Sequence, residues 1–382
     1  MKYTYGGQAC KPLLLALRYC LIMAALQDQL SWAADQSNPI QIVRRSQVLM
    51  GTLVEVTAVS ATEQVAGAAA SAALAEIRRL ESLWSTWLPE SEVSRINTAA
   101  SLKAVAVSPE TLALLRWSLQ VGRLTRGAFN IAIGPAMDAW NFSGQPRIPE
   151  AAELDRVKLL TDLSQVKIDD ANGTVFLSRP RMRIDVGGIG KGYAADLAVE
   201  VMRRVGASAG VVALSGDIKT FGELSGAQPF VFGVRHPREE DKLLARLELR
   251  NEAISTAGDY ERFFEREGSR YHHILDPHTL WPARGCQSVT VVASQGVVAD
   301  GLDTGIFVLG LERGIELVER LPEVEAIIVD DEGQVWVSSG LRNRVHLESD
   351  PGRRGQPSQS SMADQLNHLS VRFRISQGLP GG

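Results

Sequence analysis

A glycine-rich segment combines small residues with one lysine and two acids. It runs from Arg183 to Asp196 (RIDVGGIGKGYAAD), between a strand-like and a helix-like stretch. Glycines let backbone N–H groups approach an anion, a following helix presents its positive end, and Lys191 adds a point charge. The spacing is not that of a dinucleotide fold or a P-loop, because Gly192 follows the lysine where a P-loop has Ser or Thr. The segment predicts a phosphate site, and a plain strand-to-helix turn is the alternative.

Two adjacent histidines, His272 and His273, stand directly before the run Ile-Leu-Asp-Pro at 274–277. A free imidazole has a pKa near 6.5, so either ring could accept a proton from an attacking hydroxyl. Neighbouring residues of a strand point to opposite faces, and at most one of the two rings should therefore face a given site. The alternative is a histidine pair with a surface or purely structural role.

An acid and a hydroxyl, Asp300 and Thr304, lie four residues apart at the start of a predicted helix and therefore on one helical face. Such hard oxygen ligands suit Mg²⁺, which completes its shell with phosphate and water. The alternative for Asp300 is a helix N-cap.

Several long helices are predicted to position these residues. Apolar residues recur at helical spacing over 65–84, and Ser108 with Pro109 begins a helix that runs to Val121. Further helices are expected at 196–205, 302–309 and 313–321, the last two separated by Gly310.

Runs of β-branched residues predict one strand at 48–59, directly before the first helix. Other strands are expected at 165–168, 174–177, 210–214, 230–234, 243–249, 253–255, 288–293 and 326–330. Neighbouring strands mixed with long helices indicate an α+β protein.

Nothing in the charge of the chain points to nucleic-acid binding, since 40 Lys and Arg residues are dispersed against 44 Asp and Glu and give a net charge of −4. Basic residues around an apolar stretch at 13–26 predict an export signal over 1–34, with an uncleaved anchor as the alternative. A linker over 35–45 and a flexible tail over 346–382 are expected at the two ends. After signal removal only Cys286 remains, so no internal disulfide is expected.

Six segments in this order resemble the FAD:protein FMN transferase (ApbE) family. They are Met50-Gly51-Thr52, Ser85 to Trp87 with Ser91 to Asn97, Gly127 to Pro135, Asp185 to Asp196, His273 to Pro277, and Ala299 to Thr304. The resemblance covers about Met50 to Ser338 and implies one domain over 46–345. It also implies a T-fold-like α+β architecture, with mixed or antiparallel sheets and a flavin cleft between two intimately joined lobes.

The resemblance further implies a reaction, in which FMN moves from FAD, with Mg²⁺, onto a Thr or Ser hydroxyl of a target redox protein and AMP is released. Carried over by position, Gly188 through its carbonyl, Asp300 and Thr304 would hold Mg²⁺, and His273 would accept the proton. The residues that would hold FAD are Met50, Trp87, Ala128, Phe129, Asn130, Asp185, Lys191 and Leu275. The alternatives are an Mg²⁺-dependent FAD pyrophosphatase, in which water replaces the protein hydroxyl, and a flavin-binding protein without catalysis.

The chain departs from the family pattern at three positions. Trp87 stands where Tyr is usual, Asn130 replaces a common Asp, and Ala257 replaces Ser in the turn before Tyr260. Trp87 can still stack on a flat ring, although core packing is its alternative role. The export signal predicts a periplasmic protein, with a peripheral or anchored membrane association as a further option. The resemblance implies target redox subunits at the export side of the inner membrane.

Overall fold

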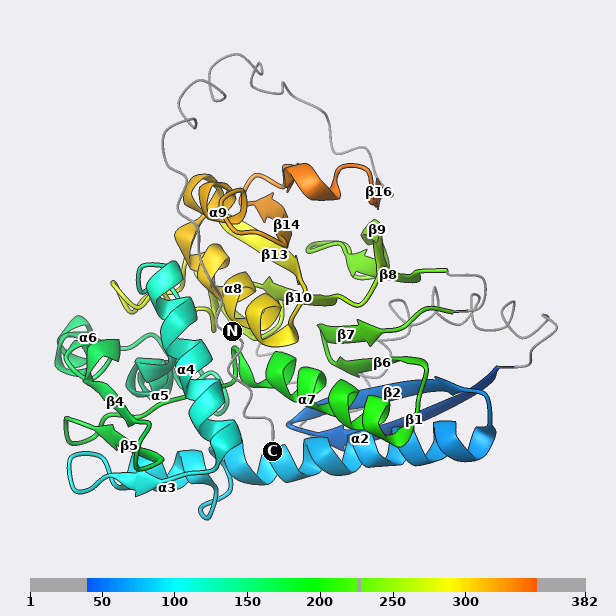
Figure 1. Ribbon diagram of the computed structural model, residues 1–382. Coiled ribbons are helices and arrows are strands. Elements are labelled where there is room, and N and C mark those ends of the chain that lie inside the picture. The colour runs from blue at the N-terminus through cyan, green and yellow to red at the C-terminus, as the bar shows by residue number, and fades with distance from the viewer. Residues whose placement is uncertain (1–39, 225–227, 349–382) are drawn as a thin grey trace. The chain divides into compact units, whose positions relative to one another are not determined.

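An eight-stranded antiparallel sheet organises the fold (Figure 1). The computed structural model describes residues 40–224 and 228–348, which belong to one compact unit of the chain. Every pair of neighbouring strands in this sheet is antiparallel. In spatial order the strands are β1 (Gln41–Leu49), β2 (Thr52–Ser60), β6 (Ala209–Leu214), β7 (Asp217–Phe221), β10 (Ala253–Gly258), β13 (Cys286–Ala293), β14 (Val324–Asp330) and β15 (Val335–Val337).

The two faces of this sheet are covered differently. Helices α2 (Glu63–Trp84) and α7 (Gly190–Val205) lie side by side against β1, β2 and β6 (Figure 1), while α8 (Gly296–Leu309) and α9 (Leu311–Val318) continue the layer over β10, β13 and β14. The opposite face packs on a smaller sheet of β8 (Phe230–Arg235), β9 (Leu243–Leu249) and β16 (Val345–Leu347). Strand β6 shows the alternation, because Val212 and Leu214 face the helices whereas Val211 and Ala213 face the smaller sheet.

A group of shorter elements carries the loops that precede the glycine-rich segment. It comprises α3 (Glu92–Thr98), β3 (Val105–Ala106), α4 (Pro109–Leu124), η2 (Ile131–Ile133), α5 (Gly134–Trp140), α6 (Ala151–Lys158), η3 (Leu163–Gln165), β4 (Val166–Asp169) and β5 (Thr174–Leu177). The hairpin of β11 (Phe263–Arg266) and β12 (Ser269–His272) packs on α5 through an aromatic cluster around Trp140, and η4 (Ser339–Leu341) precedes β16.

Local sequence explains the ends of the long helices. Thr62 caps α2 by accepting the Val65 N–H, and the alanine-rich face of α2 is buried against α7 and the sheet. Ser108 caps α4, with Pro109 at its first position, as predicted. Gly206 ends α7 in the left-handed region, at φ 103°.

The expected α+β class is confirmed, but several boundaries were wrong. The single strand predicted at 48–59 is a hairpin, in which Met50 (φ 51°) and Gly51 (φ 72°) form a two-residue turn with the positive φ values of a type I′ turn. Residues 41–45 of the predicted linker therefore belong to β1, and residues 346 and 347 of the predicted tail belong to β16. Helices α7 and α8 each begin six residues before the predicted start.

No helix in the described part of the chain is long and apolar enough to cross a membrane. The predicted signal at 1–34, residues 35–39 of the linker and the tail beyond residue 348 lie outside the described residues.

Candidate active site

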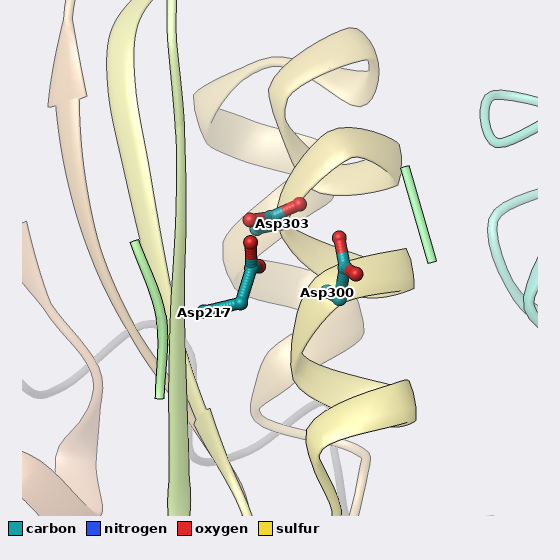
Figure 2. Close-up of side chains that lie close together, drawn as sticks. All are labelled: Asp217, Asp300 and Asp303. Carbon is teal, nitrogen blue, oxygen red and sulfur yellow. The ribbon is translucent and has the colours of Figure 1, made fainter. Parts of the chain in front are cut away.

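Three buried carboxylates converge between the sheet and helix α8. Figure 2 shows Asp217 pointing from its strand toward Asp300 and Asp303, which project from the helix. One oxygen of each acid lies within 4.8 Å of the others, and all three residues are at most 3% exposed. Asp300 and Asp303 share a face because they are three residues apart in α8, whereas Asp217 is placed by the tight turn Ser215-Gly216 that starts β7.

A serine and a lysine complete the cluster. The Ser255 hydroxyl on β10 lies 2.5 Å from Asp217 Oδ1 and 2.6 Å from Asp303 Oδ2. A hydroxyl has one proton, so it can donate to only one of these two carboxylates. Asp303 Oδ1 is buried and has no hydrogen-bond partner among the described residues. Lys191 forms an ion pair with Asp217 through its ammonium group.

The charges in this cluster are strongly coupled. Burial, and then the negative charge of Asp217, raise the pKa of Asp300 to about 7. Burial and the other two carboxylates also raise the pKa of Asp303 well above its ordinary value. Burial alone would lower the pKa of Lys191, but the Asp217 and Asp300 carboxylates outweigh it and raise that pKa. If all three acids were ionised, the cluster would have more negative charge than one ammonium group can neutralise.

These residues fit a divalent metal ion. The donors are hard oxygens, and one carboxylate oxygen has no partner among the residues that the structure describes. Like charges repel here unless protons or a cation compensate them. The predicted ligands Gly188 and Thr304 are neighbours, since a Cβ atom on Gly188 would lie 3.5 Å from Thr304 Oγ1. Asp300, Asp303 and Thr304 are thus available together with the Gly188 backbone.

Helices α7 and α8 are joined tightly at this site. Asp300 Oδ2 accepts the Gly192 N–H of α7 at 2.8 Å, and Asp196 of α7 accepts the Gly296 and Val297 N–H groups at the start of α8 at 2.7 and 2.9 Å. A Cβ atom on Gly192 would lie 2.1 Å from the Gly296 carbonyl oxygen, so only glycine permits this approach. The alternative that Asp300 caps its own helix is wrong, because Gln295 holds that position.

The adjacent histidines occupy different surroundings. His272 Nε2 lies 2.9 Å from the Ala283 carbonyl oxygen, and its ring meets Phe307 edge-on, so these contacts fix the orientation of the ring. The half-buried His273 donates its N–H to the Arg262 carbonyl, and no partner for its Nδ1 is present in the described chain. Burial and then the Arg262 charge lower the pKa of His273 well below its usual value, with a smaller contribution from Lys191. His273 is therefore neutral and able to accept a proton at pH 7.

Two predicted flavin-binding residues stand out, one by its exposed side chain and one by its backbone conformation. Trp87 is 79% exposed, so the alternative of core packing is wrong for this residue. Met50 adopts a left-handed conformation at the β1–β2 turn, where its N–H donates to Glu81 Oε1 at 2.6 Å.

The other predicted flavin-binding positions are partly engaged within the protein. Ala128 and Phe129 are buried, and the Phe129 ring lies 3.5 Å from where a Gly188 Cβ would be. The Asn130 amide donates to the Thr161 carbonyl at 2.7 Å and accepts the Ala132 N–H at 2.8 Å, so both of its ends are already used. Asp185 accepts the Gly187 N–H and thereby shapes the glycine turn. The Leu275 side chain belongs to the cluster around Trp140, which leaves mainly its backbone to face a ligand.

Sequence reasoning missed Asp217, Ser255, Asp303 and Arg262. Asp303 could have been found, because it is three residues after Asp300 and directly before Thr304. No local signal marks Asp217 or Ser255, which join the site only through the pairing of distant strands.

Comparisons with known proteins show the family of this chain. A model of the ApbE family matches residues 50–328. The FAD:protein FMN transferase of Salmonella typhimurium (strain LT2) is 30% identical over 347 residues, which cover 88% of this chain and 97% of that protein. A protein of the same name from Klebsiella pneumoniae (strain 342) is 33% identical over 259 residues, covering 67% of this chain and 80% of its own.

Solved structures show the same architecture. The ApbE protein of Thermotoga maritima superposes with a TM-score of 0.74 at 32% identity and covers 80% of this chain and 99% of its own. The flavin transferase ApbE of Vibrio cholerae gives a TM-score of 0.72 at 27% identity and covers 80% of this chain and 100% of its own. The expected ApbE architecture is thereby confirmed.

Proposed function

Because the chain belongs to the ApbE family, we propose that it is an FAD:protein FMN transferase that uses the buried acidic cluster as its Mg²⁺ site. The observation that carries this proposal is the convergence of Asp217, Asp300 and Asp303 beside the glycine turn and Lys191. Relatives that share most of the chain bear the name of this activity.

Asp300, Asp303, Thr304 and the Gly188 carbonyl would hold the metal ion. When bound there, Mg²⁺ supplies positive charge against the pyrophosphate of FAD and the leaving AMP. Asp217 and Ser255 orient this set, since the Ser255 hydroxyl contacts both Asp217 and Asp303. Lys191 lies against the same acids and adds a fixed positive charge on the side of the glycine turn.

His273 is the proposed proton acceptor. It would take the proton from the Thr or Ser hydroxyl of the target protein as that oxygen bonds to the FMN-side phosphorus. The bond from that phosphorus to the oxygen of AMP breaks in the same displacement, and AMP leaves with the electron pair. His272 cannot substitute, because its ring is held by the Ala283 carbonyl and Phe307.

Trp87 is the proposed stacking surface for a flat ring of FAD, because an exposed indole beside the start of α3 is available to a ligand. Phe129 beside Gly188 would limit how deeply the flavin enters.

Intact mass spectrometry of a Thr-bearing acceptor domain tests the function. The acceptor is incubated with this protein lacking its first ~34 residues, with FAD and Mg²⁺, and the same reaction is run with His273→Ala and with EDTA. A mass gain of one FMN with the unaltered protein, lost in both controls, is the expected result. An unchanged acceptor with accumulating AMP and free FMN would assign the pyrophosphatase instead, and intact FAD would reject both activities for that acceptor.

We propose the periplasm, at the export side of the inner membrane, as the place of action. The support is the basic and apolar pattern of residues 1–34. Fractionation of cells that express the full chain tests this, and recovery of the uncleaved protein from the cytoplasm would reject it.

A further inference from the structure

A polar cavity of about 320 Å³ is lined by none of the residues of the acidic cluster. Its walls come from the loop after β8, the residue after β10, strand β12, the start of β13 with the segment before it, and the residue after β14. The residues used below are Arg238, Arg270, Arg284, Asp259, Asp331 and His272. Neither His273 nor any acid of the proposed metal site lines this cavity.

Cations outnumber anions in this wall, with three arginines against two aspartates. Asp259 is fully engaged, because Arg238 donates to both of its oxygens at 2.7 and 2.8 Å and Arg270 lies 3.5 Å from Oδ1. Arg270 also contacts Glu265 at 3.1 Å and stacks over Phe263. Arg284 is exposed and has no ion pair within the described residues. Asp259 and Glu265 therefore pair with two of the three arginines, whereas the Arg284 guanidinium has donors to spare.

His272 adds a buried acceptor to the same wall. The residue is 3% exposed, and Nε2 must carry the ring proton because its partner, the Ala283 carbonyl, can only accept. Nδ1 is then a lone-pair acceptor, and it is buried without a partner in the described chain. Burial lowers the pKa of His272 to about 4, so the ring stays neutral at physiological pH. A buried unpaired acceptor calls for a donor from a molecule that enters the cavity.

We propose that this cavity binds an anionic group that also carries a hydrogen-bond donor, with Arg284 as its main charge partner and His272 Nδ1 as acceptor. Two sources share this chemistry. One is a free hydrogenphosphate or hydroxycarboxylate, and the other is an acidic side chain of the target protein with a neighbouring backbone N–H. An occupant of either kind would thus contact the residue that directly precedes the proposed base, His273.

Calorimetric titration of phosphate, and separately of malate, tests the first source. The full protein is saturated with FAD without metal ion, so that the nucleotide site is filled and no transfer occurs. Arg284→Gln and Arg284→Glu are compared with Arg266→Gln, which alters an arginine of equal charge on exposed β11. Binding of one anion to the unaltered protein and to Arg266→Gln, at least fivefold weaker in Arg284→Gln and absent in Arg284→Glu, supports a free anion.

Steady-state transfer to the acceptor domain tests the second source, which rests on the proposed function. A KM for the acceptor that rises at least fivefold in Arg284→Gln and further in Arg284→Glu, at unchanged kcat and with no anion binding, supports an acidic side chain. Unchanged KM together with no anion binding overturns the proposal. The calorimetry needs no transfer, so if no acceptor is modified, absence of anion binding alone overturns it.

Discussion

Asp196 and Asp300 each bind the first turn of the helix that carries the other. Asp196 on α7 accepts two N–H groups at the start of α8, and Asp300 on α8 accepts the Gly192 N–H at the start of α7. A carboxylate at a helix N-terminus is favourable because it pairs with free N–H groups and the positive end of the helix dipole. The position of the proposed metal acid is therefore set by the same contact that joins the glycine turn to α8.

Substitution of Gly192 by alanine should force α7 and α8 apart. The new Cβ would lie 2.1 Å from the Gly296 carbonyl oxygen and 2.7 Å from Asp300 Cβ. Overpacking of this kind lowers the free energy of unfolding by about 1–3 kcal/mol. The displaced Asp300 should also raise the Mg²⁺ concentration that gives half-maximal transfer. Thermal unfolding and a Mg²⁺ titration of the transfer rate measure both effects.

Gly67→Ala is the matched control, because Gly67 lies within α2 and its Cβ would be 3.6 Å from Arg45, an ordinary contact. The free energy of unfolding of the Gly67→Ala protein should rise by up to about 1 kcal/mol, because alanine favours a helix more than glycine does. A Gly192→Ala protein as stable and active as Gly67→Ala would show that the helices do not need this close approach.

The apparent affinity for Mg²⁺ should fall as the pH is lowered below about 7. The pKa of Asp300 is raised to about 7, and a carboxylate must lose its proton to bind a metal ion. Below that pH protons compete, so the half-saturating Mg²⁺ concentration should rise by up to about tenfold per pH unit. Transfer rates measured against Mg²⁺ at several pH values check this, and a constant half-saturation between pH 5.5 and 7 would contradict the role of Asp300.

The acid limb of the pH–rate profile, measured at saturating Mg²⁺, should lie well below pH 6.5. A base acts in its neutral form, and burial together with Arg262 lowers the pKa of His273, so the rate stays constant until the pH approaches that lowered value. Arg262→Gln removes one positive charge and should move the limb toward higher pH by up to about one unit. His273→Ala should reduce the transfer rate about 10²–10⁴-fold. If Arg262→Gln leaves the acid limb at the same pH, a group other than His273 is titrating.

Loss of the Trp87 ring should weaken FAD binding without affecting stability. The side chain is 79% exposed, so Trp87→Ala removes little packing. Stacking contributes about 0.5–1.5 kcal/mol, which corresponds to a roughly two- to twelvefold rise in the Kd for FAD, whereas Trp87→Phe should retain most of it. Flavin fluorescence titration gives the Kd and thermal unfolding gives the stability. An unchanged Kd in Trp87→Ala would remove this residue from the flavin site.

The sequence predicts long periodic elements well and short ones poorly. Helix α2 was placed to within two residues because its apolar positions recur over 22 residues. Strand β7 was missed because all five of its residues are buried, including a lysine and a threonine. Lys219 is accommodated by donating to the Asn251 and Ser294 carbonyls, an arrangement that no local pattern indicates.

The same limit applies to the site. Asp300 and Thr304 could be assigned to one site from their spacing on one helix. The glycine turn could be recognised from its composition. Asp217 and Ser255 are 38 residues apart, and Ser255 is 48 residues from Asp303, so their meeting depends on the order of strands in the sheet. The hairpin at Met50-Gly51 was missed for another reason, because methionine rarely adopts a positive φ.

The strands of the large sheet are arranged in the order in which a ribosome makes them, from β1 to β15. Each new strand can join an edge that already exists, so the sheet can assemble progressively from the N-terminal side. The acids of the cluster are made at different stages of that process, with Asp217 on the fourth strand and Asp303 in the helix after the sixth. A growing chain can thus acquire much of its sheet before its complete set of acidic ligands exists, which separates early folding from metal capture.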